Sequence, residues 1–181
     1  MLPEIVRHTL EVYLTEKRIP VFSDFHANAI QYTSTKESIF VTLFLAGKII
    51  ASSGRIQCKK ENTLMETIDN TLLCLSDMRF TENLKNVKEL EKIHIRVDHF
   101  TPDKRKIIKS PAELDIAQDG LIFLSQPLGK MSILLPKITN VTSNGEQLFD
   151  IACKKAGVDR KTLKPGDYIL YSIRTTIESD F

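Results

Sequence analysis

Apolar and polar positions alternate in several short segments, and this period of two predicts β-strands. Ser38 to Leu45 is fairly apolar on both faces, which predicts a central strand, and after a turn Lys48 to Gln57 returns as the second strand of a hairpin. Residues 92–101 alternate apolar with polar side chains and predict a strand with one face in water. Further strands are predicted over Leu121 to Ser125, Met131 to Leu135 and Tyr168 to Ile177.

Helical periodicity and end signals predict the helices. Pro3 to Glu16 carries apolar residues at helical spacing. Three capping boxes, in which a Ser or Thr is followed three residues later by Glu, predict helix starts. They are Thr63 with Glu66, Ser110 with Glu113, and Ser143 with Glu146. Gly157 predicts the end of the last helix, because glycine adopts the left-handed conformation at little cost.

The order of these elements predicts an α+β fold with an antiparallel or mixed sheet built from hairpins and flanked by helices. Helices are interspersed without the regular rhythm of a doubly wound fold. The length of 181 residues fits a single domain over residues 1–181, and we expect it to fold as one compact unit. The residues expected in the core are Leu43, Ile49, Ile68, Leu72, Ile95, Val97, Ile122, Ile133, Leu148 and Ala152.

Charge and cysteine content narrow the classes of partner. The formal net charge is +2, from 25 basic and 23 acidic residues, which provides no argument for nucleic acid or membrane as the main partner. Three separated cysteines predict reduced thiols rather than a disulfide framework. With no signal-peptide pattern, we expect a cytoplasmic protein. We predict no cofactor.

Basic residues nevertheless gather in the second half of the chain. They include Lys104, Arg105, Lys106 and Lys109, and a second group between Lys154 and Lys164. Such a group can be a weak nucleic-acid footprint or a solvated surface. Because no aromatic stacking motif interleaves the charges, we favour the solvated surface.

The stretch GKIIASSGRIQC, Gly47 to Cys58, has an unusual composition for a strand. It begins with β-branched residues and then contains only small ones, Ala51 to Gly54. Small residues in a strand indicate a bulge or the close approach of another group. We predict that the helix starting at Thr63, or the segment Asp77 to Phe80, packs over them. On that hypothesis Ser52→Leu costs about 1–3 kcal/mol through overpacking.

Several short segments, in order, resemble the AMMECR-type domain family. They are Ile39-Phe40-Val41-Thr42-Leu43 followed by Gly47, Asp77-x-Arg79-Phe80, Ile95-x-Val97, Asp119-Gly120-Leu121-Ile122, Leu134-Leu135-Pro136 and Lys155-Ala156-Gly157. The resemblance implies a larger lobe around an antiparallel sheet and a smaller lobe beside it. It implies no reaction. It does imply a possible protein partner of the radical-SAM or Memo-like type, near which such proteins are encoded.

The hallmark of that family is the hexapeptide Leu-Arg-Gly-Cys-Ile-Gly in the second strand of the hairpin. Aligned here, it falls on Ile49-Ile50-Ala51-Ser52-Ser53-Gly54, so that only the final glycine is kept. Ile50 stands at the family arginine and Ser52 at the family cysteine. Thiol chemistry or anion binding by this hexapeptide is therefore in doubt for this chain.

The candidate ligand or partner residues are Ser52, Gly54, Asp77 and Arg79. Ser52 as a nucleophile needs an adjacent base, and nothing nearby in the sequence supplies one. Asp77 and Arg79 follow a predicted helix, so they bind a polar ligand or form an ion pair at the helix end. We expect small-residue packing for Ser52 and the ion pair for the other two.

A metal site at His94, Asp98 and His99 was weighed and is not predicted. In a strand His94 and Asp98 share a face while His99 points to the other, and two ligands are too few. Asp24 and His26 join them only if the fold brings the segments together.

Two functions of different classes remain. The first is a non-catalytic binding or regulatory protein, favoured by the missing arginine and cysteine and by the lack of an alternative catalytic set. The second is an enzyme, or the accessory subunit of an enzyme, that acts with a radical-SAM or Memo-like partner. A cleft lined by Ser52, Asp77 and Arg79 favours the second, and a filled core there favours the first. Nucleic-acid binding is the weakest of the three, and we expect no membrane partner.

Overall fold

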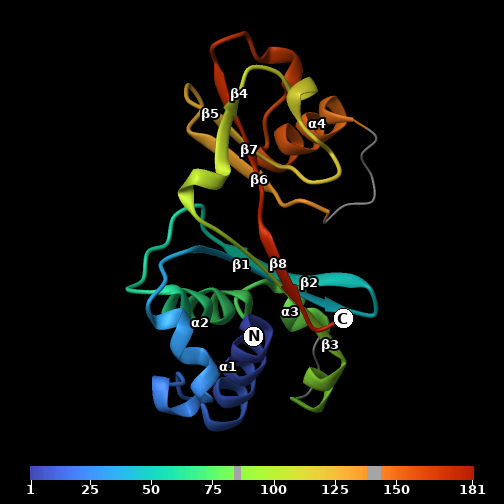
Figure 1. Ribbon diagram of the computed structural model, residues 1–181. Helices are drawn as coiled ribbons and strands as arrows, with labels where there is room; N and C mark the ends of the chain where they lie inside the picture. Colours follow the sequence, from blue (N-terminus) through green and yellow to red (C-terminus); the bar gives the residue numbers. More distant parts are fainter. Residues whose placement is uncertain (84–86, 138–143) are drawn as a thin grey trace. The chain divides into compact units, whose positions relative to one another are not determined.

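The chain forms two compact units with α+β architecture (Figure 1). The structure is a computed structural model that describes residues 1–83, 87–137 and 144–181. Unit 1 comprises Met1–Pro102 and Thr176–Phe181, and unit 2 comprises Asp103–Thr175. The predicted fold class and the division into a larger and a smaller lobe are therefore confirmed. Whether the two units unfold together, as the expectation of a single domain requires, stays a prediction.

Unit 1 is built from three α-helices, four strands and short 3-10 helices among the described residues. The α-helices are α1 (Leu2–Glu16), α2 (Thr63–Cys74) and α3 (Met78–Asn83). The strands are β1 (Ser38–Leu45), β2 (Lys48–Gly54), β3 (Ile93–Phe100) and β8 (Thr176–Ser179). The 3-10 helices are η1 (Phe22–Asp24), η2 (Ala27–Thr33) and η3 (Val87–Lys92). The helices and strands predicted in this part of the sequence are all present.

The strands of unit 1 form an antiparallel sheet, sheet A, in the order β2-β1-β3-β8. Helices α1 and α2 lie on the same side of this sheet in Figure 1, and the core of the unit lies between them and the strands. Ile39, Val41 and Leu43 of β1 point into this core, as the period of two requires.

A bulge interrupts the hairpin of β1 and β2 and changes which residues of β2 are buried. The register shifts between Leu43 and Phe44, which face Ala51 and Ile49, so Ile50 is the extra residue. As a result Ile50 and Ala51 are both buried in the core. Ile49, which we expected in the core, is only partly buried.

The start of α2 differs from the predicted capping box. Asn62 is the N-cap and accepts a hydrogen bond from the backbone N–H of Met65 at 2.9 Å. The hydroxyl of Thr63 instead accepts from the backbone N–H of Glu37 at 3.0 Å. Glu66 is fully buried and binds the loop before the helix, as described below. The helix was predicted correctly, but the residues that begin it were not.

The polar face of β3 is also different from the prediction of a face in water. Arg96 is 6% exposed and Asp98 is fully buried, whereas His94 on the same face is exposed. The guanidinium donates from Nε and Nη2 to the two carboxylate oxygens of Asp98 at 2.7 and 2.8 Å. A bidentate pair of opposite charges can be buried because each charge satisfies the other.

Unit 2 has one α-helix and four strands among the described residues. The helix is α4 (Gly145–Ala156), and the strands are β4 (Arg105–Ile108), β5 (Gly120–Ser125), β6 (Lys130–Leu134) and β7 (Tyr168–Ile173). Three 3-10 helices complete the unit: η4 (Pro102–Lys104), which begins at the last residue of unit 1, η5 (Pro111–Glu113) and η6 (Arg160–Thr162). The predicted strand from Tyr168 to Ile177 is divided at Arg174, and its second part belongs to sheet A as β8.

The strands of unit 2 form a second antiparallel sheet, sheet B, in the order β4-β7-β5-β6. Helix α4 packs on one face through Leu148, Phe149 and Ala152, which meet Phe123 and Leu170 of the sheet. This is a separate core from that of unit 1.

The helix starts and ends that the sequence predicts for unit 2 are confirmed only in part. Ser110 and Glu113 form the predicted capping box, although the helix is the short η5. Ser143 lies outside the described residues, and the N-cap of α4 is Asn144, so the predicted box does not begin this helix. Gly157 ends α4 with φ 68°, as predicted.

Seven of the ten residues expected in the core are buried. They are Leu43, Ile68, Ile95, Val97, Ile122, Leu148 and Ala152. Ile49, Leu72 and Ile133 are only partly buried. For two of them a neighbour of similar character is more buried, Ile50 beside Ile49 and Leu134 beside Ile133.

Candidate functional site

The residue at the hallmark cysteine position, Ser52, lies on the face of sheet A opposite to the helices. It is exposed and pairs across the strands with Thr42, whose hydroxyl lies 3.4 Å from the hydroxyl of Ser52. Thr42 in turn pairs with Arg96 of β3. The side chains of Ser52, Thr42 and Arg96 are therefore cross-strand neighbours on this face, and Arg96 is paired with the buried Asp98. No imidazole or carboxylate contacts the Ser52 hydroxyl among the described residues.

Asp77 and Arg79 meet Ser52 just after α2. The backbone N–H of Ser52 donates to Oδ2 of Asp77 at 3.3 Å. The guanidinium of Arg79 donates to both oxygens of Asp77 at 3.0 and 2.6 Å, and the backbone N–H of Arg79 adds a bond of 3.1 Å. This arrangement is the helix-end ion pair that the sequence suggested, with Ser52 attached to it.

The ion pair determines the electrostatics of this cluster. Hydrogen bonds from Arg79 lower the pKa of Asp77, and those to Asp77 raise the pKa of Arg79. Asp77 is therefore a poor proton acceptor near neutral pH and cannot serve as a general base for Ser52. Arg79, with a half-exposed side chain, still presents donors to solvent. The cluster can bind a polar partner, but it holds no nucleophile-and-base pair.

Gly54, the fourth predicted residue, does not join this cluster. A Cβ built on Gly54 would lie 2.1 Å from Cδ1 of Phe40, which pairs with it across the hairpin. Phe40 also stacks on Phe100 with ring centroids 6.0 Å apart. Gly54 is small because an aromatic ring of the neighbouring strand covers it, and this gives it a packing role.

The nearby thiol is unsuited to catalysis. Cys74, at the end of α2, is fully buried, and its thiol lies 3.8 Å from the carbonyl oxygen of Val41. Burial raises its pKa to about 12. Because the thiolate is the reactive form, this cysteine is inert in the folded protein.

The hypothesis that α2 or the segment Asp77 to Phe80 packs over the small residues of β2 agrees with the contacts of Ala51 and Ser53, whereas at Gly54 the neighbouring strand packs instead. Ala51 is in the core, the hydroxyl of Ser53 lies 3.3 Å from Oδ1 of Asn70 on α2, and Gly54 is covered by Phe40. Ser52 differs from these, because its side chain is exposed and only its backbone is held by Asp77. Overpacking by a larger residue at this position is no longer expected.

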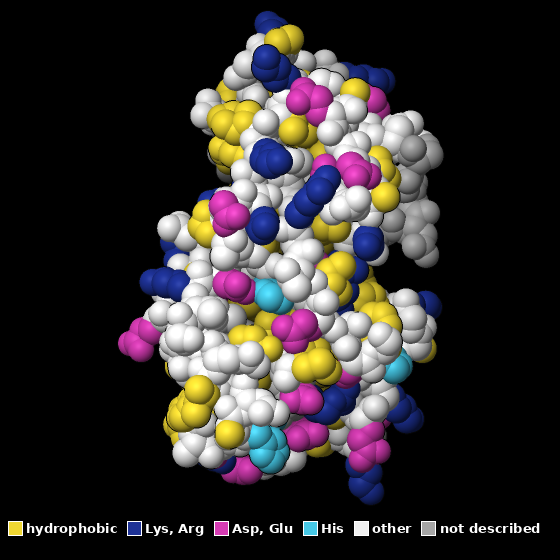
Figure 2. Space-filling view, in the orientation of Figure 1, with side chains coloured by type: hydrophobic (Ala, Val, Ile, Leu, Met, Phe, Trp, Pro, Cys, Tyr) yellow, Lys and Arg dark blue, Asp and Glu magenta, His cyan; other side chains and the backbone are white. Residues whose placement is uncertain are grey.

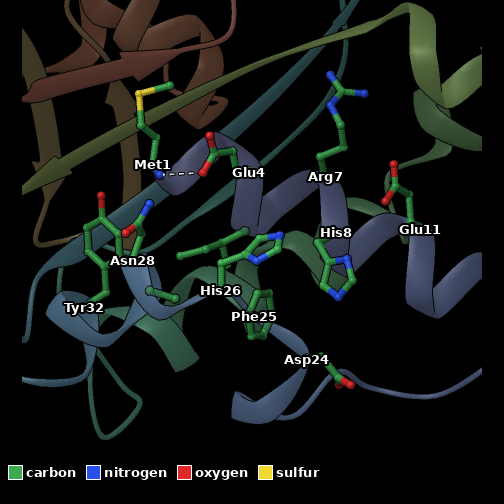
Figure 3. Close-up of a pocket in the computed structure, with 12 residues that line it drawn as sticks. Met1, Glu4, Arg7, His8, Glu11, Asp24, Phe25, His26, Asn28 and Tyr32 are labelled. Carbon is green, nitrogen blue, oxygen red and sulfur yellow. Dashed lines mark hydrogen bonds and ion pairs between the residues drawn. The ribbon is translucent and has the colours of Figure 1, made fainter.

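A cavity of about 430 Å³ lies elsewhere in unit 1, between α1 and the segment that holds η1 and η2 (Figure 3). It contains none of the four predicted residues. The side chains around it include His8 and Glu11 of α1, and Phe25, His26 and Tyr32 from the segment. From this segment the sequence singled out only Asp24 and His26, as residues that could join a metal site, so the cavity was missed.

Most charges around this cavity already have partners. Arg7 donates to the carbonyl oxygens of Leu90 and Ile93 and to Asp180, and in Figure 3 it points away from His8. Asp24 accepts two bonds from Arg18, and these lower its pKa to about 2. The cavity is thus a mixed polar and aromatic hollow without a concentrated charge.

His8 is the most informative side chain of the cavity. Its Nε2 is buried and has no hydrogen-bond partner among the described residues. Its ring meets Phe25 edge to face, with centroids 5.3 Å apart. Phe25 packs against the core, whereas Phe22 is 47% exposed and does not hold the segment.

The residues weighed for a metal take other partners. His99 lies between Glu37, which it contacts through Nδ1, and Glu178, whose Oε1 is 3.5 Å from Nε2. His94 lies 3.9 Å from Asp180. Throughout residues 1–83, 87–137 and 144–181 no three His, Cys, Asp or Glu side chains come together as a metal site.

The group around His99 is a partly buried polar cluster that joins four segments. Glu178 of β8 accepts from the backbone N–H of Leu2 at 2.8 Å and from the hydroxyl of Tyr32 at 3.2 Å. Burial alone lowers the pKa of His99, but its contacts with Glu178 and Glu37 outweigh burial and raise it. Contact with His99 lowers the pKa of Glu178. No spacing in the sequence could have signalled this cluster, because its members are far apart in the chain.

Comparison with known proteins places the chain in a family. The AMMECR1 family model matches residues 3–176. The chain belongs to the AMMECR1 family. A search of curated proteins finds no match.

Among solved structures, the chain is similar to the crystal structure of the uncharacterized protein PH0010 from Pyrococcus horikoshii. The TM-score is 0.80 with 20% sequence identity, and the match covers 97% of this chain and 88% of that chain. At this identity the likeness concerns the AMMECR1 fold alone. As to membranes, no helix in the described part of this family member is long and apolar enough to cross a bilayer.

Proposed function

We propose that this AMMECR1-family protein is a non-catalytic binding or regulatory protein. One observation carries the proposal: at the hallmark hexapeptide, every group that could react already has a partner or is buried. Ser52 has only a threonine hydroxyl beside its own, Asp77 is engaged by Arg79, and Cys74 is buried.

Two further features favour binding. The cluster of Ser52, Asp77 and Arg79 is accessible at the surface, with the Arg79 side chain 51% exposed. The cavity beside α1 provides a concave surface with hydrogen-bonding side chains and aromatic rings, which is typical of a binding site. We further propose a cytoplasmic location and a protein partner.

The alternative is an enzyme or an accessory subunit that works with a radical-SAM or Memo-like partner. No contact among the described residues favours it, so it rests on the family alone. It predicts that adding this protein changes the rate at which a purified radical-SAM partner cleaves its cosubstrate, and our proposal expects no change.

The test of the proposal is covalent labelling of the folded protein. A fluorophosphonate probe for activated serine and iodoacetamide for accessible thiols would be applied before and after addition of urea, with sites located by mass spectrometry. We expect no label on Ser52 in the folded state, and label on Cys74 only after unfolding. Stoichiometric label on Ser52 that disappears in Asp77→Asn would contradict the proposal, because it would reveal an activated hydroxyl.

A further inference from the structure

The face of sheet B away from α4 is largely apolar. Helix α4 covers the face that holds Phe123 and Leu170, and alternation places their neighbours on the other face. We call this other face the open face. The residues of its two central rows are Ile107, Ile122, Leu124, Met131, Ile133, Ile169 and Tyr171, of which Ile122 is buried. Arg105 and the buried Ile173 lie beyond them on the same face.

Strand register arranges these residues in two rows. Ile107, Tyr171, Ile122 and Ile133 stand opposite one another across all four strands, and Ile169, Leu124 and Met131 form the next row. Ile107 is 69% exposed and Met131 is 47% exposed. Figure 2 shows hydrophobic side chains gathered on the side of unit 2 away from α4.

The open face ends at a strand edge that can accept another strand. In the described residues β4 pairs with β7 alone. The backbone N–H of Arg174 donates to the carbonyl oxygen of Lys104. Because antiparallel pairs alternate, the backbone N–H and C=O groups of Arg105 and Ile107 point away from β7. Within the described ranges they have no hydrogen-bond partner, so they can bind the backbone of an extended segment.

The same edge is strongly basic. Lys104, Arg105, Lys106 and Lys109 lie along it, and the last three have no ion pair within the described part of the chain. Of the two acidic residues that flank β4 in the sequence, Asp103 lies 3.9 Å from Lys104, and Glu113 accepts from the backbone N–H groups of Lys109 and Ser110. Unit 2 as a whole has 12 Lys and Arg residues against 8 Asp and Glu residues.

We propose that β4 is a docking edge for an extended acidic segment of a partner protein, which adds to sheet B as a fifth strand. Alternation would place its aliphatic side chains beside Ile107 on the open face. Its carboxylates would then face Lys106, which points to the other side. Backbone bonds supply affinity and the alternating side chains supply selectivity in this mode of recognition. The inference rests on the proposed binding function and specifies its partner.

Two other occupants fit the edge less well. A second copy of the chain paired edge to edge would bring the basic groups of two β4 strands together, and this repulsion is a known device against such pairing. A single-stranded nucleic acid would use the positive charge but would leave Ile107, at the centre of the edge, without an apolar contact. Nor are aromatic platforms interleaved with the basic residues.

The experiment measures binding of the whole chain to a synthetic peptide, acetyl-Glu-Val-Glu-Ile-Asp-Val-Glu-Ile-amide. Titration followed by ¹H–¹⁵N spectra should shift the amide signals of Arg105 and Ile107. A matched peptide with Lys at every acidic position should bind at least about tenfold more weakly. Methylation of the backbone nitrogens that face β4 should abolish binding, while methylation of the alternate nitrogens should not.

Two variants test the protein side. Ile107→Glu and Lys106→Glu should each weaken binding at least about tenfold, because the first removes the apolar contact and the second reverses the charge that faces the carboxylates. Ile30→Glu is the matched control, since Ile30 is an exposed isoleucine of unit 1 at 56%, and it should leave binding unchanged. Unaltered thermal unfolding would verify that both edge variants are folded.

Each other result overturns the inference. Equal binding of both methylated peptides would exclude strand addition. Concentration-dependent dimers in sedimentation that Ile107→Glu dissociates would assign the edge to a second copy. Tight binding of a ten-nucleotide single strand that Lys106→Glu removes would assign it to nucleic acid. If no peptide binds while Ser52 stays unlabelled, the docking edge is wrong and the proposed binding function stands. If Ser52 is labelled while the peptide still binds, the non-catalytic function is contradicted and the docking edge stands.

Discussion

Units 1 and 2 have the same components, a four-stranded antiparallel sheet with helix packed on one face. They differ in how many charged side chains lie in the interior. Unit 1 buries charged side chains in pairs and networks, at Glu66 and at Arg96 with Asp98, and partly buries another group at His99. Among its described residues, unit 2 buries one charged side chain, Asp119, which accepts from Arg174 at its surface, and its hydrophobic cluster is otherwise built from apolar residues. Buried polar groups are costly unless each one has a hydrogen-bond or ion-pair partner. The stability of unit 1 therefore depends more strongly on such pairs inside the protein than the stability of unit 2 does.

The network at Glu66 illustrates this dependence. One carboxylate accepts from the backbone N–H groups of Lys59 and Lys60 at 2.8 and 2.9 Å, from Arg55 at 2.9 Å and from Asn70 at 3.1 Å. Burial raises its pKa, but these hydrogen bonds outweigh burial and lower it. The loop between β2 and α2 is thereby folded around a single buried charge.

The largest expected effect is in the core of unit 2. Phe123→Ala should lower the free energy of unfolding by about 4 kcal/mol, because Phe123 is fully buried against Phe149. Hydrogen exchange would then show whether unit 1 keeps its protection. Retained protection of unit 1 would mean that the units unfold separately. Loss of protection in both would support the single domain expected from the sequence.

A slightly smaller effect is expected at Glu66 in unit 1. Glu66→Gln should cost about 3 kcal/mol, because the isosteric amide leaves buried donors without an acceptor. Glu146→Gln in the exposed pair with Arg160 of unit 2 is the matched control and should cost less than about 1 kcal/mol. Equal costs for the two changes, measured by urea unfolding, would remove the contrast between the units.

Gly54 tests the packing of the hairpin. Gly54→Ala should cost about 1–3 kcal/mol, since the new Cβ meets the ring of Phe40. Combination with Phe40→Leu should recover part of that loss, because the ring that obstructs the methyl group is gone. Full additivity of the two changes would show that this contact is unimportant.

The cluster of His99 and Glu178 predicts a pH dependence confined to unit 1. His99 has its pKa raised from 6.5, so its contribution is complete below pH 6.5 and is lost as the pH rises through the raised pKa. Glu178 has its pKa lowered from 4.5, so its contribution is present above pH 4.5 and is lost as the pH falls through the lowered value. Stability from this cluster is greatest between those limits. His99→Gln should flatten the profile of unfolding free energy against pH, and an unchanged profile would contradict the pairing.

The smallest effect is expected at Ser52. Ser52→Leu should change stability by less than about 0.5 kcal/mol, because the side chain is exposed. Ser52→Cys should be equally neutral and should add no reactivity toward substrates, because no base is in contact. A loss above 1 kcal/mol in the leucine variant, measured by thermal unfolding, would restore the overpacking hypothesis drawn from the sequence.

The sequence alone determined the local features of this protein. Periodicity identified α1, β1 and the main hairpins, because amphipathic patterns report which face of an element is buried. The ordered short segments identified the family, and the ion pair of Asp77 with Arg79 followed from their position after a helix. These features depend on residues that are close together in the chain.

Only the tertiary structure decided the rest. The bulge that buries Ile50 in place of Ile49 depends on pairing between strands, and the burial of Arg96 depends on its bond to Asp98. The division of the last predicted strand between two sheets depends on which partner each half meets. The cluster around His99 brings Glu37 and Glu178 together across more than a hundred residues of sequence. Long-range contacts of this kind are set by the packing of the whole unit, and no local pattern encodes them.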